Sequence, residues 1–208
     1  NYEAFTYQYD TVAPTNPSTI SVTPTGYTAT DNYDFLWAAD VTDDYSGVVK
    51  FQYRTDGDAL GVWVDIDDPD AFQVTIPNAD HLVGAYQSGK NKFYLRAVDA
   101  AGNTSASLMQ EYYYSASAPT PPQNLTVTPS TSTDNSFAFA WDQPASFVGD
   151  STKLVYRYSI NVLPTPSNTV STSLTAAGPA AFATQKGENL FFVVAEDEAA
   201  NIEYNNYA

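Results

Sequence analysis

The side chains that could carry catalysis in this chain are few. His81 is the only histidine, and there is no cysteine. A serine triad would need His81 as its base, and no G-x-S-x-G nucleophile elbow accompanies it. Paired carboxylates can hydrolyse glycosides, but no acidic residue here stands in an apolar stretch that would suit it to proton transfer. These residue types predict that the segment is not an enzyme, and we interpret His81 as a loop residue.

Aspartate is the one reactive residue type that gathers locally, in runs at 40–44 and 65–70. Ca²⁺ takes about six to eight oxygen ligands, often from one short loop and its neighbours. Neither run matches the EF-hand pattern, which requires a Gly at a set place. Calcium is therefore the one candidate cofactor, with solvated turn residues as the alternative interpretation. The candidate ligands are Asp40, Asp43, Asp44, Asp65, Asp67 and Asp68.

Charge and hydropathy exclude other classes. Acidic residues outnumber Lys and Arg by 24 to 8, which gives a net charge of −16 and a surface that repels nucleic acid and anionic membranes. No apolar run approaches the ~20 residues of a membrane span. The chain starts with Asn, which fits a removed signal peptide or a fragment. Sequons at Asn103 and Asn124 permit glycosylation.

Five blocks of sequence occur twice in the same order, which indicates an internal duplication. In chain order the pairs are APTNP (13–17) and APTPP (118–122), ISVTP (20–24) and LTVTP (125–129), FLWA (35–38) and FAWD (139–142), FQYR (51–54) and VYR (155–157), and FYLRAVDAAGN (93–103) and FFVVAEDEAAN (191–201). The fourth pair aligns Arg54 with Arg157.

The repeated blocks alternate as strands do. Phe93, Leu95 and Ala97 follow one another at a period of two. Short strands separated by clusters of Gly, Pro, Asn and Asp indicate an all-β sandwich, and the APTPP segment is a stiff linker because Pro fixes φ. The sequence predicts an N-terminal strand followed by two tandem β-sandwich domains, at 1–12, 13–116 and 117–208 respectively.

Four sequence motifs stand out: the Pro-rich start of each repeat, the Trp that ends the second strand (Trp37 and Trp141), the WAAD…SGV segment of the first repeat at 37–48, and its AVDAAGN turn at 97–103. These resemble bacterial fibronectin type III and related Ig-like tandem repeats of extracellular surface proteins, over nearly the whole chain from Val12 on. The resemblance implies Ig-like or fibronectin-III-like sandwiches, tryptophans in both cores, and an extracellular or cell-surface location. It does not fix the function, because such modules serve as spacers, adhesins, enzyme appendages and filament subunits.

One feature departs from that resemblance. Such domains often carry a Tyr early in the sixth strand, where Asn91 and Asn189 stand here. Asn can bond the local backbone, so we expect this corner to be held differently. At the following turn Gly102 is expected to take a positive φ, and Ala200 in its place predicts a different turn in the second repeat. The Asp and Asn residues that flank this turn are interpreted as structural.

The two ends of the duplication are unequal. Residues 5–15 (FTYQYDTVAPT) line up with 110–120 (QEYYYSASAPT), which begins with the last strand of the first repeat, whereas the run after residue 201 is short. Three interpretations are open: residues 1–9 complete the second repeat of a neighbouring copy by strand addition, belong to a missing domain of a longer array, or fold back onto their own first domain. For the first, the candidate interface residues are Phe5, Tyr7, Tyr9, Ile202 and Tyr204.

Two functional hypotheses follow. In the first, the chain is a structural subunit of an extracellular filament, pilus-like fibre or surface layer, and its partner is itself, because a head-to-tail contact does not close. In the second, it is a pair of spacer or carbohydrate-binding modules of a larger secreted enzyme or adhesin, with neighbouring domains or surface glycans as partners. Trp63 is a candidate for stacking on a sugar or a subunit, or for packing at the sandwich edge.

Overall fold

The computed structural model describes residues 3–56, 62–76 and 87–208, so His81 lies outside the described residues. The chain divides into two compact units, the first formed by residues up to 25 with 30–114 and the second by 26–29 with 115–208. The division after Tyr114 lies two residues before the predicted boundary. No helix in the described part of the chain is long and apolar enough to cross a membrane.

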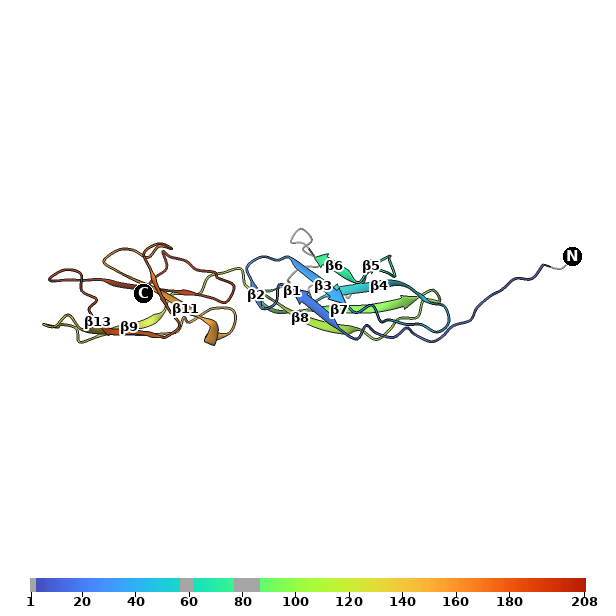
Figure 1. Ribbon diagram of the computed structural model, residues 1–208, viewed down its shortest axis with the longest axis horizontal. Helices are drawn as coiled ribbons and strands as arrows, with labels where there is room; N and C mark the ends of the chain where they lie inside the picture. The colour runs from blue at the N-terminus through green and yellow to red at the C-terminus, as the bar shows by residue number, and fades with distance from the viewer. Residues whose placement is uncertain (1–2, 57–61, 77–86) are drawn as a thin grey trace. The chain divides into compact units, whose positions relative to one another are not determined.

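The first unit is a sandwich of two antiparallel sheets (Figure 1). One sheet has the order β1-β3-β6, and the other contains β8, β7, β4 and β5 as successive neighbours. In Ig nomenclature these are A-B-E and G-F-C with an added edge strand, the order of an Ig-like sandwich. Strand bounds up to the division are β1 (Ile20–Thr23), β2 (Tyr27–Thr28), β3 (Tyr33–Trp37), β4 (Val48–Thr55), β5 (Val64–Ile66), β6 (Gln73–Ile76), β7 (Gly89–Asp99) and β8 (Leu108–Tyr114).

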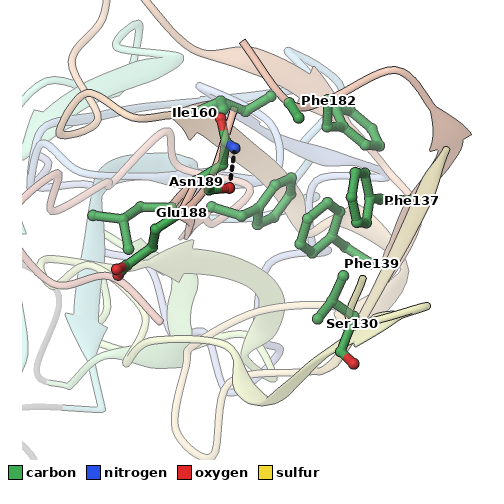
Figure 2. Close-up of a pocket in the computed structure, with 12 residues that line it drawn as sticks. Ser130, Phe137, Phe139, Ile160, Phe182, Glu188 and Asn189 are labelled. Carbon is green, nitrogen blue, oxygen red and sulfur yellow. Dashed lines mark hydrogen bonds between the residues drawn. The ribbon is translucent and has the colours of Figure 1, made fainter. Parts of the chain in front are cut away.

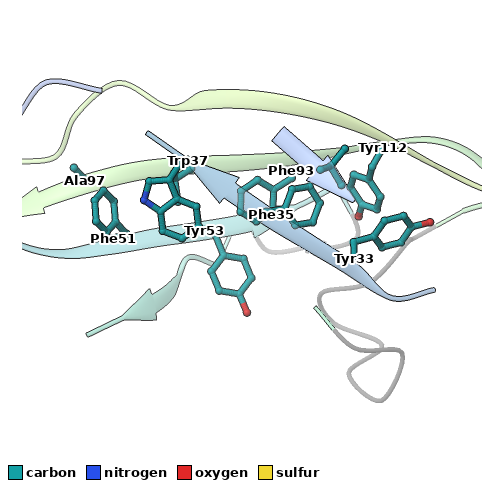
Figure 3. Packing of buried hydrophobic residues seen from close by; sticks show 10 residues of the cluster. Tyr33, Phe35, Trp37, Phe51, Tyr53, Phe93, Ala97 and Tyr112 are labelled. Carbon is teal, nitrogen blue, oxygen red and sulfur yellow. The ribbon is translucent and has the colours of Figure 1, made fainter. Parts of the chain in front are cut away.

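Alternation along the strands builds the core of this unit. Along β3 the side chains of Tyr33, Phe35 and Trp37 are buried while the two between them are exposed, as a period of two requires. Phe35 stacks on Phe93 of the opposite sheet with ring centroids 3.9 Å apart. Tyr112 of β8 lies at the end of this stack, beside Tyr33 (Figure 3).

The second unit repeats the design with two three-stranded sheets. Its sheets have the orders β13-β10-β9 and β12-β11-β14. Trp141 is buried here, as Trp37 is in the first unit, which confirms the prediction for both. No strand is described after β14, so no strand of the described residues neighbours β14 as β8 neighbours β7. The elements are β9 (Gln123–Thr128), β10 (Phe137–Asp142), the 3-10 helix η1 (Ser151–Lys153), β11 (Val155–Ile160), β12 (Val170–Thr172), β13 (Ala176–Ala180) and β14 (Phe191–Glu196).

Strand pairing corrects one detail of the repeat alignment. Phe51 lies opposite Ala97 in the first unit, and Tyr156 lies opposite Ala195 in the second. Tyr156 is therefore the counterpart of Phe51, and the predicted match of Arg54 with Arg157 is wrong by two residues. A slip of two keeps every side chain on its face of the sheet, so the alternation of the sequence could not detect it.

The corner at the start of strand F, which is β7 in the first unit and β14 in the second, is held by Asn, as the departure from the Tyr pattern suggested. The Asn91 amide donates to the carbonyls of Gln87 (2.9 Å) and Gly89 (3.1 Å). In the second unit the Asn189 amide makes the corresponding bonds to Gln185 (3.0 Å) and Gly187 (3.1 Å). The side chain thus ties each corner to its own backbone.

The sequence predicts a different turn after β14 in the second repeat, and this prediction is wrong. Ala200 takes φ +63°, as Gly102 takes φ +91°. Each donates its N–H to the backbone carbonyl of the Asp three residues earlier, at 3.0 Å from Ala200 to Asp197 and 3.2 Å from Gly102 to Asp99. The Asp197 carboxylate also accepts the N–H of Asn201 at 2.8 Å. These bonds impose the left-handed conformation despite the cost of about 1–2 kcal/mol that an L residue carries there.

Candidate functional site

The free edge of β14 is the site at which the two units differ most. In the first unit β7 pairs with β8 over seven residues, from Gly89 opposite Tyr114 to Leu95 opposite Leu108. In the second unit the Val193 N–H donates to the Ala208 carbonyl (3.2 Å) and the Ala208 N–H to the Val193 carbonyl (3.0 Å). Since Val193 is the counterpart of Leu95, Ala208 occupies the place of Leu108.

From Phe191 back to Asn189, this edge has no strand partner among the described residues. Backbone groups alternate in direction along a strand, so the N–H and C=O of Phe191 and Asn189 point to the same side as those of Val193. The backbone N–H and C=O groups of Phe192 and Val194 point instead toward β11, with which these residues pair. An open row of donors and acceptors is a template for one more strand.

An apolar groove of about 220 Å³ opens beside this edge (Figure 2). Its lining includes Phe137, Phe139, Phe182 and Phe191, which come from two strands of opposite sheets and the segment after β13. Asn189 lies across the groove from these rings. The sequence indicated the missing strand but not the groove, since the exposure of these rings depends on how the two sheets close.

Burial at matched positions shows that the core is incomplete here. In the first unit Phe35 and Phe93 are fully buried, whereas their counterparts Phe139 and Phe191 are only partly buried. The pattern extends to the neighbouring valine, because Val22 is 8% exposed and Val127 is 38% exposed. Exposed apolar side chains next to an open sheet edge favour a contact with another segment.

The N-terminal segment presents the predicted aromatic side chains to solvent. Phe5 is 84% exposed, Tyr7 91% and Tyr9 87%. No strand or bridge includes residues 3–9, so the described structure does not show the segment folded back onto the first unit. The other two predicted interface residues lie outside the groove lining: Ile202 forms a bridge with Glu196, and Tyr204 stands in a turn.

The predicted calcium ligands do not come together as one group. Asp65 binds Lys50 (2.6 Å) and Gln52 (2.6 Å), and the hydrogen bonds lower the pKa of its carboxyl. Asp40 accepts the N–H of Ser18. Asp44, Asp67 and Asp68 are exposed.

Asp43 alone joins an acidic cluster, with Asp10 and Asp99, in which one carboxylate oxygen from each lies within 4.8 Å of the others. The Ser46 hydroxyl donates to Asp10 at 2.6 Å, and this bond, followed by that from the Val12 N–H, lowers the pKa of Asp10. None of the described ion pairs involves these three carboxylates. The sequence could not reveal the cluster because its members are far apart along the chain.

The Asn at each turn after the sixth strand holds the segment that leads into its own unit. The Asn103 amide donates to the carbonyl of Asp10 at 3.3 Å, and the Asn201 amide to that of Ser115 at 2.8 Å. These residues have the structural role that the sequence indicated. The amide nitrogens of both sequon residues are hydrogen-bonded, that of Asn103 to Asp10 and that of the exposed Asn124 to the Asp142 carboxylate at 2.7 Å.

Trp63 packs at the sandwich edge against cationic side chains. The guanidinium of Arg96 lies 4.1 Å from the centre of its ring and that of Arg54 lies 5.4 Å from it. Arg54 also lies 4.2 Å over the ring of Tyr94. These cation–π contacts stabilise the outer surface of β4 and β7 and occupy ring surface that a sugar would use.

Comparisons with known proteins add little to this geometry. No protein-family model matches the chain, and no curated protein matches it. Among solved structures the chain is similar to the FN1-FN3 domains of chicken CNTN1, with 16% sequence identity and a TM-score of 0.42. The match covers 91% of this chain and 62% of that one. The all-β tandem-sandwich fold is established by the strand order described above.

Proposed function

We propose that this chain is a non-catalytic structural subunit of an extracellular filament, pilus-like fibre or surface layer. Subunits join head to tail when the N-terminal segment of one copy adds to the β14 edge of the next. The observation that carries the proposal is the open edge of β14 beside partly exposed core phenylalanines, in a chain that also presents Phe5, Tyr7 and Tyr9 to solvent. Main-chain hydrogen bonds supply affinity in such strand addition, and alternate side chains supply specificity.

The geometry of this contact favours a polymer. The donor segment and the acceptor edge are different surfaces of the same chain, so each copy that donates still has its own acceptor free. A contact of this heterologous kind grows as an open filament unless the rotation closes a ring. The extracellular location is part of the proposal, and the motifs shared with surface-protein repeats support it.

Sedimentation and electron microscopy of the purified chain test the proposal. The intact chain is expected to form concentration-dependent polymers, and deletion of residues 1–9 is expected to abolish them. Tyr45→Ala is the matched control, since Tyr45 is a 62% exposed aromatic residue outside the segment. Because each subunit carries a net charge of −16, added salt should promote assembly by screening repulsion.

Polymers that persist unchanged after the deletion would overturn strand addition. An intact chain that stays monomeric at high concentration and high salt would favour the alternative, tandem spacer modules of a longer secreted protein.

A further inference from the structure

The first unit shows what normally fills the space that is open in the second. Tyr112 of β8 is 1% exposed, and its ring lies edge-on to Tyr33 at 4.6 Å and to Phe35 at 5.3 Å. It closes the end of the Phe35–Phe93 stack, whose centroids are 3.9 Å apart (Figure 3). One strand-G tyrosine thus seals this end of the core.

The second unit has the corresponding stack without a strand-G ring, and Phe182, from the segment after β13, lies edge-on to Phe139 at 5.3 Å. Phe139 stacks on Phe191 at the same 3.9 Å, and Phe137 takes the place of Tyr33. The rings open onto the groove of about 220 Å³ (Figure 2). Since a buried apolar cavity of about 150 Å³ accommodates benzene, this space is large enough for a phenol ring.

Strand register fixes which residue of an added strand would meet the groove. In β8 Tyr112 lies opposite Asn91, whose counterpart is Asn189. The pair of Val193 with Ala208 sets the same register, so the residue opposite Asn189 takes the place of Tyr112. In the N-terminal segment that residue is Tyr7, because residues 5–9 align with 110–114.

We propose that Tyr7 of a second copy inserts into this groove, opposite Asn189, with Phe5 opposite Phe191 and Tyr9 opposite Gly187. This assignment rests on the proposed function and names the specificity-determining residue of its contact. In this register Ala4 of the second copy takes the position next to Ala208 along the edge of β14. Residues 4–9 therefore add to the edge without displacing Ala208.

One hydrogen bond distinguishes the donated strand from an internal one. In the first unit the Tyr33 hydroxyl donates to the carbonyl of Tyr113 at 3.0 Å, which fastens β8 across the sandwich. Phe137 has no hydroxyl and cannot fasten residue 8 of a donated strand. The inserted strand is therefore held more weakly than β8, and Phe137→Tyr should supply the absent bond.

The test measures binding of a fluorescent peptide of residues 3–12 to the full chain carrying Tyr7→Ala, by anisotropy. Tyr7→Ala in the peptide should weaken binding about 10- to 100-fold, as expected for loss of one buried aromatic side chain. Tyr7→Phe and Thr11→Ala should each stay within about threefold, since Phe keeps the ring and Thr11 is an exposed residue outside the segment 4–9 that pairs with the edge. Phe137→Tyr in the acceptor should tighten binding about 2- to 10-fold.

Each outcome bears on a different statement. Equal binding of the wild-type and Tyr7→Ala peptides, or no binding of either, would overturn the insertion of Tyr7. If the intact chain polymerises and Tyr7→Ala polymerises equally well, the insertion falls while the proposed function stands. If the peptide binds as described but the intact chain never polymerises, the insertion stands and the filament function falls. Circular dichroism of the Phe137→Tyr chain confirms that the acceptor is folded.

Discussion

Tyr112 is the residue whose removal tests most directly how strand G closes a unit of this protein. Its buried ring contacts Tyr33 and Phe35, and burial raises the pKa of its hydroxyl. Truncating a buried aromatic side chain to Ala costs about 3–5 kcal/mol, because the transfer free energy is lost and a cavity remains. We expect Tyr112→Ala to lower the free energy of unfolding of the first unit by that amount. Tyr112→Phe keeps the ring and should cost no more than about 1.5 kcal/mol.

Hydrogen exchange followed by mass spectrometry suits this measurement, because it reports each strand separately in a chain of two units. The slowest amides of β7 report the first unit, and those of β14 serve as a reference within the same molecule. A loss below about 1 kcal/mol in β7 would refute the reasoning, and so would an equal loss in β14, since Tyr112 packs in the first core.

Three further predictions concern the turns and the acidic cluster. Ala200→Gly should stabilise the second unit by about 1 kcal/mol by relieving its positive φ, and Gly102→Ala should destabilise the first by a similar amount; urea titrations that show no opposite signs would contradict this. Ser46→Ala should raise the pKa of Asp10 toward its usual value, measured by NMR titration. Because the folded-state pKa of Asp10 is lowered, its contribution to stability is present above the unfolded pKa and is lost as pH falls through the folded value. Calcium binding stays a prediction: Ca²⁺ should raise the melting temperature and Asp43→Asn should remove that rise, whereas a melting temperature insensitive to Ca²⁺ argues against a site.

The fold could be predicted well because its signals are local. Alternation in segments such as 93–97 marks strands, and the ordered blocks mark a duplication, so two sandwiches with Trp37 and Trp141 in their cores follow from the sequence. The alignment of 5–9 with 110–114 also predicts a strand-like segment at the N-terminus without reference to any structure. The errors at Arg157 and Ala200 arose where the sequence pattern tolerates more than one answer, a two-residue slip or an alanine with positive φ.

What the sequence by itself determined is the duplication of a sandwich domain, preceded by an N-terminal segment that resembles the last strand of the first repeat. Only the tertiary structure decided where a core is left open, since the exposure of Phe139 and Phe191 depends on how two sheets pack face to face beside an edge that has no further strand among the described residues. The same holds for the meeting of Asp10, Asp43 and Asp99, which lie on separate segments. Contacts between distant segments are set by sheet closure and register, and neither leaves a periodic trace in the sequence.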